Sequence, residues 1–240
     1  MNIANKTILI TGSNRGIGRA LVEEALRRRV QRVYAGTRAS WKHADSRLST
    51  IALDVTSAIQ IQQAVTEIES LDVLINNAGI AIYDDLTNPD VIGQHLDVNL
   101  FGALNVTRAF LPLLKRSKGA VINNISISAL AALPITPGYS ISKAAALSMT
   151  QSLRALLRGK GVTVHAVLTG PVDTDMTRSV DFPKASPASV AAAIFDGLDR
   201  GEEEIFPDPM SQSMANGWRN GVVKDLERRV AAILPKSVTL

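Results

Sequence analysis

Short, continuously apolar runs alternate with longer stretches of helical periodicity along this chain. The runs Thr7–Thr11 and Val73–Asn76 contain no charged side chain, which is typical of parallel strands that helices cover on both faces. Strands that alternate with helices along a whole chain indicate βαβ units around a parallel sheet. We therefore predict an α/β fold, a doubly wound parallel sheet of about seven strands with helices on both faces.

The same pattern places these elements along the sequence. Strands are expected at residues 7–11, 32–36, 50–53, 73–76, 120–125, 162–168 and 204–206, and helices at 16–29, 57–70, 89–116, 138–158, 187–198 and 222–234. No internal repeat or linker interrupts them, and 240 residues fit one domain of ordinary size. We therefore treat residues 1–240 as a single domain.

Two segments are expected to shape a pocket. Segment 173–186 is irregular and polar and follows the sixth expected strand. Ligands of doubly wound sheets bind at the carboxyl ends of strands, so we expect this segment to form a substrate lid, with an ordinary surface loop as the alternative. The segment at about 208–220 is expected to border the same pocket.

Composition excludes several classes of protein. The chain has no cysteine, which excludes a disulfide framework and a zinc–thiolate site. Its sequence contains no apolar run of about 20 residues and no signal-peptide pattern, so we expect a soluble cytoplasmic protein with no membrane partner. His43, His95 and His165 lack metal-ligand spacing, so no metal site is expected.

A glycine-rich turn joins the first expected strand to the first expected helix. Gly12, Gly16 and Gly18 follow the spacing G-x-x-x-G-x-G. Glycines at this place let the backbone approach a pyrophosphate, and the helix N-terminus offers free N–H groups and the positive end of its dipole. The position between a strand and a helix favours a dinucleotide site over a glycine turn without a ligand.

Two motifs together resemble a known family. The segment Thr11–Gly18, followed by Asn76-Asn77-Ala78-Gly79 after the fourth expected strand, resembles the classical short-chain dehydrogenase/reductase family, NADP-preferring members included, from about Lys6 to Thr174. The resemblance implies a Rossmann-type fold and hydride transfer between a nicotinamide dinucleotide and a small-molecule carbonyl or alcohol. It also implies a homo-oligomer, a dimer or a tetramer.

The resemblance implies a set of cofactor contacts on this chain. One departure from the family pattern is that proline stands at position 171, one residue late, in the segment Thr169–Thr174. The implied cofactor-binding residues are Gly12, Ser13, Arg15, Gly16, Ile17, Gly18, Thr37, Arg38, Asp54, Val55, Asn77, Ala78, Gly79, Tyr139, Lys143, Gly170, Val172 and Thr174.

The residues around the second expected strand indicate which dinucleotide binds. An NAD site usually places an acidic residue about 20 positions after the glycines, where it holds the ribose 2′-hydroxyl. No acidic residue occurs between Ala25 and Ala44, and Arg38 stands two residues after the expected strand 32–36. Arg38, with Arg15 from the glycine turn, can pair with a 2′-phosphate through charge-assisted hydrogen bonds. We therefore predict NADP(H) as the cofactor.

Tyr139 and Lys143 are four residues apart in an expected helix, so they share one face. A free tyrosine has a pKa near 10 and is a weak base at neutral pH. A nearby ammonium favours the phenolate and lowers that pKa. We therefore expect Tyr139 to act as the proton donor or acceptor, with Lys143 lowering its pKa.

The family resemblance implies two further catalytic residues. A serine that orients the substrate oxygen is expected thirteen residues before the tyrosine, which selects Ser126, with Ser128 as the alternative. Asn99 is expected to hold a water in a proton path to the lysine. Its alternative is local hydrogen bonding to the helix backbone.

Other functions compete with that of an NADPH-dependent carbonyl reductase. The first is an NADPH-sensing regulator without turnover, which would need only the glycine turn. The second is nucleic-acid binding through the basic segment 27–38, but interleaved aromatics and a recognised module are missing there. Residues Leu104, Phe110, Leu111 and Leu114 have helical spacing and are expected to form a core face first, with a subunit interface as the alternative.

Overall fold

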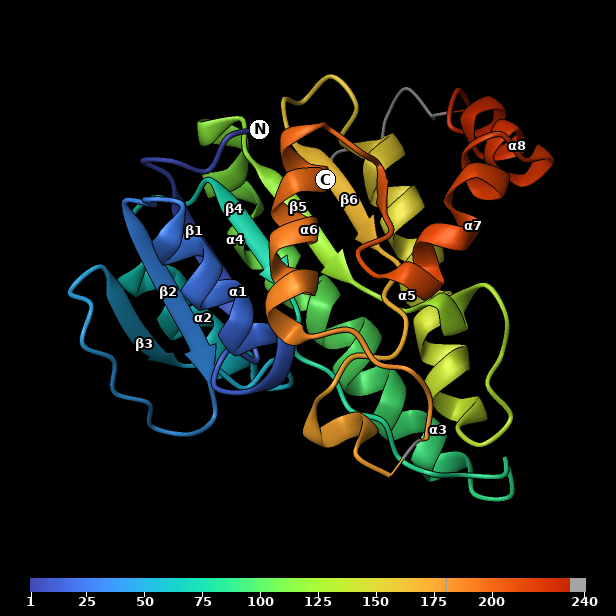
Figure 1. Ribbon diagram of the computed structural model, residues 1–240. Helices are drawn as coiled ribbons and strands as arrows, with labels where there is room; N and C mark the ends of the chain where they lie inside the picture. Colours follow the sequence, from blue (N-terminus) through green and yellow to red (C-terminus); the bar gives the residue numbers. More distant parts are fainter. Residues whose placement is uncertain (180, 234–240) are drawn as a thin grey trace.

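A seven-stranded parallel sheet forms the centre of the computed structural model, which describes residues 1–179 and 181–233 (Figure 1). The strand order is β3-β2-β1-β4-β5-β6-β7, so the chain reverses its winding direction between β1 and β4. This confirms the predicted doubly wound sheet of seven strands. The strands are β1 (Thr7–Thr11), β2 (Arg32–Thr37), β3 (Leu48–Ala52), β4 (Val73–Asn76), β5 (Ala120–Asn124), β6 (Thr163–Val167) and β7 (Glu204–Ile205).

Helices cover both faces of the sheet. Ile8 and Ile10 of β1 pack in one core with α1 (Gly16–Arg27) and α6 (Pro187–Asp199). Leu9 points to the other face, as strand alternation requires. There it packs with α2 (Ala58–Glu67), α4 (Ala103–Ser117) and α5 (Pro137–Leu156).

Three residues of the apolar stripe predicted on the long helical region form a core face, as expected. Phe110, Leu111 and Leu114 of α4 are buried in the same core as Leu9. They pack within this chain, which favours the core interpretation over a subunit interface for these three residues.

The helical region expected at 89–116 is not uniform. It consists of α3 (Pro89–Leu96), a π-helical turn at Asp97–Gly102 and then α4. A side chain at Gly102 would place its Cβ 2.6 Å from Val55, so glycine lets this turn lie against the loop after β3. Single π-helical turns inside α-helices are frequent at functional sites, and this one carries Asn99.

The C-terminal region departs from the prediction. Residues Pro209–Arg219 form helix α7, whereas the sequence pattern indicated only a pocket-shaping segment. Asp208 caps this helix through a capping box with Ser211, and a proline follows as its first residue. The last helix, α8 (Val222–Val230), ends before the expected limit of 234, a residue that lies outside the described ones.

Buried ion pairs attach helix α8 to the rest of the domain. Lys224, 2% exposed, contacts carboxylates of Glu203, Glu204 and Glu227 at 2.8–3.0 Å, and Arg154 of α5 lies 2.8 Å from Glu204. These contacts fix α8 against β7. The three carboxylates are already paired with two cations, so this cluster is an ion-pair network. Among the described residues, no helix is both long and apolar enough to cross a membrane.

Gly18 tests how closely the turn after β1 is packed. A Cβ at Gly18 would lie 2.1 Å from the carbonyl oxygen of Gly12, whereas one at Gly93 in α3 would meet no atom within 4 Å. We predict that Gly18→Ala lowers the free energy of unfolding by about 3 kcal/mol, the upper part of the range for overpacking. The matched control Gly93→Ala should raise it by up to about 1 kcal/mol, since alanine favours helix.

Urea unfolding followed by circular dichroism measures both differences. Equal stabilities of Gly18→Ala and the unchanged protein would contradict the packing described for this turn.

Candidate active site

A cavity of about 420 Å³ opens at the carboxyl ends of β1, β4, β5 and β6. Its lining includes Arg38 and Asp54, the glycine turn, and Ser126 and Tyr139. The structure thus brings together residues that lie far apart in the sequence. Every residue that the sequence predicted for the site lines this cavity, except Ser13 and Asn99.

The glycine turn is braced by the segment after β4. Gly12 has a φ of +65°, and a Cβ there would lie 2.8 Å from the Cα of Ala78. The amide of Asn77 donates to the carbonyl oxygens of Thr11 and Gly12, while the Thr11 hydroxyl accepts from the backbone N–H groups of Asn77 and Ala78. The two motifs that predicted a dinucleotide site are therefore one hydrogen-bonded unit.

Ser13 connects this turn to strand β2. It is buried, and its hydroxyl donates to the carbonyl oxygen of Gly36 in β2 at 3.0 Å. Its side chain thus joins the turn to the sheet and does not reach the cavity wall.

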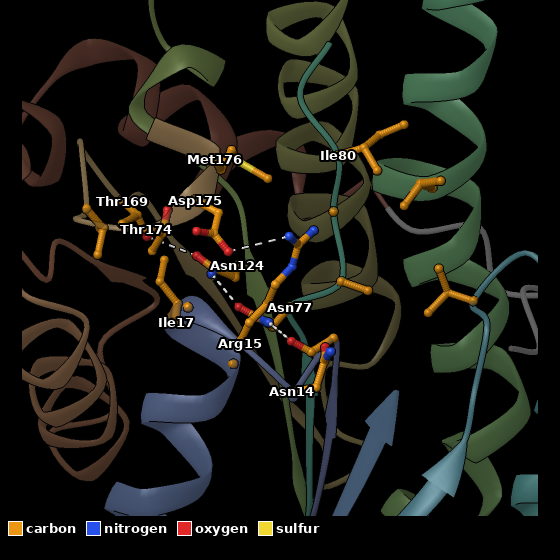
Figure 2. Close-up of a pocket in the computed structure, with 18 of the residues that line it drawn as sticks. Asn14, Arg15, Ile17, Asn77, Ile80, Asn124, Thr169, Thr174, Asp175 and Met176 are labelled. Atoms are coloured by element: carbon orange, nitrogen blue, oxygen red, sulfur yellow. Dashed lines mark hydrogen bonds and ion pairs between the residues drawn. The ribbon is translucent and has the colours of Figure 1, made fainter. Parts of the chain in front are cut away.

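The N-terminus of α1 faces the cavity. Arg15 occupies the N-cap position and makes no side-chain cap, so the first N–H groups of α1 have no side-chain acceptor there. Such a terminus suits an anion. The Arg15 side chain is exposed and lies 3.6 Å from Asp175 of the segment after β6 (Figure 2).

Burial controls the acidity of Tyr139 and Lys143. Removal from water raises the pKa of Tyr139 to about 12, and a hydrogen bond with Ser126 opposes this in part. Burial lowers the pKa of Lys143 to about 8. The Lys143 ammonium lies 5.5 Å from the centre of the Tyr139 ring and donates to the carbonyl of Asn124 at 3.0 Å. Desolvation therefore outweighs the influence expected from Lys143, and the net shift of the pKa of Tyr139 is upward where the sequence predicted a downward shift.

The two competing serines occupy different environments. Ser126 lines the cavity and hydrogen-bonds to Tyr139. The Ser128 hydroxyl is buried without a hydrogen-bond partner among the described residues, and its backbone N–H donates to the Ser126 hydroxyl at 3.1 Å. Of these two serines, only Ser126 lines the cavity that Tyr139 also lines.

Asn99 acts through its neighbours. Its side-chain amide accepts from the N–H of Ile80 at 2.9 Å and donates to the Ile80 carbonyl at 3.0 Å and to the hydroxyl of Ser142 at 2.9 Å. Ser142 in turn donates to the carbonyl of Tyr139 at 2.7 Å. Asn99 therefore fixes the loop after β4 to the helix that carries Tyr139, and its expected water stays a prediction.

The sequence model described as short chain dehydrogenase matches residues 6–184. The chain belongs to the short-chain dehydrogenase family.

Three similar proteins illustrate the range of this family. Ketoacyl reductase HetN of Nostoc sp. is 32% identical over 236 residues, which cover 88% of this chain and 82% of that protein. Estradiol 17-beta-dehydrogenase 2 of Mus musculus is 32% identical over 196 residues, 75% of this chain, but this span is only about half (51%) of its own length. A short-chain dehydrogenase from Burkholderia cenocepacia, solved in complex with NADP, has a TM-score of 0.87 and 36% identity, covering 98% of this chain and 100% of that one.

Hydrogen bonds fix the residues just before the displaced proline of this short-chain dehydrogenase. The Thr169 hydroxyl donates to the side-chain oxygen of Asn124 at 2.9 Å, and Asn124 donates to Asn77 (Figure 2). The N–H of Gly170 donates to the carboxylate of Asp208 at 2.7 Å. Thr169 thus joins the segment after β6 to the segments after β4 and β5.

Sequence reasoning missed two residues beside Tyr139. The carboxylate of Asp84 accepts from the N–H of Gly138 at 3.1 Å and caps α5, whose own N-cap residue makes no side-chain cap. The buried ring of His95 accepts from the N–H of Ile82 and meets the Tyr139 ring edge-on, with centroids 6.2 Å apart. Asp84 and Gly138 are 54 residues apart, so no local spacing could have indicated this cap.

We expect the buried ammonium group of Lys143 to destabilise the folded state of the protein. Its folded-state pKa lies below the usual value of 10.5, at about 8, which corresponds to about 3 kcal/mol. Below pH 8 the amine is charged in the folded and unfolded states alike, and this penalty is complete. We predict that Lys143→Met raises the free energy of unfolding at pH 7 by about 2 kcal/mol, because the hydrogen bond to Asn124 is lost and offsets part of the gain.

The pH dependence is the control for this prediction. The advantage of Lys143→Met should shrink as pH rises from 8 to 10.5, where the lysine becomes neutral in both states. Urea unfolding of the cofactor-free protein across this range measures it. A variant less stable than the unchanged protein at pH 7 would show that Lys143 is not held at a desolvation penalty.

Proposed function

We propose that the protein is an NADPH-dependent oxidoreductase that exchanges a hydride with a carbonyl or secondary alcohol substrate. One observation carries this proposal: Ser126, Tyr139 and Lys143 line the same cavity as the glycine turn. A hydride source and a proton donor can therefore meet one substrate.

The residues of the cavity fit a dinucleotide along its length. The N–H groups at the start of α1 would bind the pyrophosphate, and Asp54 would contact the adenine. Gly170, Val172 and Thr174 line the same cavity and would border the nicotinamide. When bound, NADPH supplies the hydride, and the protein supplies orientation and the proton.

Arg38 and Arg15 would bind the 2′-phosphate of NADPH. Both are exposed and line the cavity. The acidic residue that holds a ribose 2′-hydroxyl in NAD sites is missing from this part of the sequence. The NADP in the similar Burkholderia cenocepacia structure supports this choice.

The proton chemistry follows from the two pKa shifts. With a pKa of about 12, Tyr139 stays protonated at neutral pH and can donate to a carbonyl oxygen that Ser126 also holds. With a pKa of about 8, Lys143 still carries its proton at pH 7. Its charge would stabilise the phenolate left on Tyr139, and Asn99 would support the path that restores the proton. The pair is thus set for reduction at neutral pH.

Reversing the charge at position 38 tests whether the protein prefers NADPH to NADH. We predict that Arg38→Asp lowers kcat/KM for NADPH by about 100-fold. The change removes a charge-assisted hydrogen bond worth about 1.5–3 kcal/mol and adds repulsion of the 2′-phosphate. The value for NADH should stay within about threefold. Steady-state kinetics with one carbonyl substrate and both cofactors measure the ratio.

Arg116→Asp is the matched control, because Arg116 is an exposed arginine in the last turn of α4, away from the cavity. It should leave the NADPH/NADH ratio unchanged. A ratio in Arg38→Asp equal to that of the control would contradict the role given to Arg38.

A further inference from the structure

Exposed apolar side chains from three loops and from the start of α7 lie on the side of the molecule where the strands end, and we call this set the apolar rim. Large apolar groups gathered at one exposed place usually mark a binding surface. The rim consists of Tyr83, Leu133, Ile135, Met176, Phe182 and Met210, each between 37% and 60% exposed.

Contacts connect the three loops to the cavity or to one another. Met176 lines the cavity directly, and the Tyr83 hydroxyl is 2.9 Å from the hydroxyl of Ser179, which joins the loop after β4 to the segment after β6. The N–H of Leu133 donates to the hydroxyl of Ser140, the neighbour of Tyr139. Figure 1 shows these loops together at the ends of the strands.

The loop that leads into α5 carries no charge. Residues 125–136, between Asn124 and the helix of Tyr139, contain no acidic or basic side chain. Most of them are isoleucine, leucine or alanine. A substrate whose carbonyl reaches Ser126 and Tyr139 therefore passes an uncharged wall.

The flanking loops are acidic, although the chain as a whole has a net charge of +4. Residues 77–88 and 168–186 carry five aspartates and two cations, a local net charge of −3. Of the two cations, Arg178 is ion-paired with Asp175, which also lies 3.6 Å from Arg15 of the glycine turn. The five aspartates are Asp84, Asp85, Asp173, Asp175 and Asp181.

We infer, building on the proposed function, that the substrate is an uncharged, predominantly apolar carbonyl compound or the matching secondary alcohol. The apolar rim stabilises apolar groups by removing them from water, whereas the acidic loops repel anions that approach the same opening. The acidic loops would repel an acyl group attached to a polyanionic carrier. They would not repel the same acyl group attached to an uncharged carrier.

The reaction balances with the groups already named. The carbonyl carbon accepts the hydride of NADPH, the carbonyl π pair moves to oxygen, and that oxygen takes the phenol proton of Tyr139. The products are the secondary alcohol and NADP⁺, and the phenol regains a proton from solvent.

Matched pairs of substrates test the inference. In each pair, one carbonyl compound is offered with and without a distant negative charge. Examples are acetophenone against 4-acetylbenzoate, and one 3-oxoacyl chain as its N-acetylcysteamine ester against its coenzyme A ester. NADPH oxidation at low salt should give a kcat/KM at least tenfold higher for the uncharged member.

Two further readouts separate charge from other causes. The difference in kcat/KM between the two members of each pair should become smaller as ionic strength rises from about 0.01 M to 0.15 M. The reason is that the screening length falls from about 30 Å to about 8 Å. Within an uncharged series, each added methylene should raise kcat/KM roughly three- to fourfold until the rim is filled.

A charge-reversal variant locates the effect. Asp85→Lys combined with Asp181→Lys changes two exposed aspartates of the entrance loops. This variant should reduce the ratio of kcat/KM between the uncharged and the charged member of each pair at least threefold. Asp225→Lys, at an exposed aspartate of α8, is the matched control and should leave the difference unchanged.

The outcomes distinguish this inference from the proposed function. Preference for the uncharged members, with the salt and variant effects, supports it. Equal values within each pair, or preference for the anions, would overturn the inference and leave the oxidoreductase assignment intact. Tight NADPH binding without oxidation by any carbonyl compound would overturn the proposed function and this inference with it.

Discussion

The close approach of the backbone at Gly12 and Gly18 is the constraint on which the rest of the site depends. There the turn after β1 packs against Ala78 and is hydrogen-bonded by Asn77, across the point where the sheet reverses its winding. This contact directs the start of α1 into the cavity. Asn124, which donates to Asn77 and whose carbonyl accepts from Lys143, carries the same framework to the proton-transfer end.

The proton-transfer end is fixed by contacts over long sequence distances. Asp84 caps the helix that begins two residues before Tyr139, and Asn99 ties that helix to the loop after β4. These contacts hold Tyr139 and Lys143 where burial shifts their pKa values toward the neutral forms. With a pKa of about 12, Tyr139 stays protonated at neutral pH, which is the state that the proposed carbonyl reduction requires.

Local features of the sequence predicted much of this arrangement. The spacing of Tyr139 and Lys143, the glycine turn and the alternating apolar runs each depend on neighbouring residues, and each was placed correctly. Helix α7 was missed because its mostly polar composition gives little apolar periodicity. The capping residue Asp208 was the better signal for it. The cap from Asp84 and the pKa of Tyr139 were not predictable, since spacing along a helix reports a nearby charge but not the desolvation that outweighs it.

The central claim is that Tyr139 is the proton donor to a substrate held beside NADPH. Single-turnover NADPH oxidation by Tyr139→Phe, with NADPH affinity measured by fluorescence on the same sample, tests it most directly. The account predicts an NADPH Kd within about fivefold of the unchanged protein and a hydride-transfer rate lowered at least about 100-fold, the smaller end of the usual contribution of a general acid. A variant that binds NADPH and keeps more than about a tenth of that rate would contradict it.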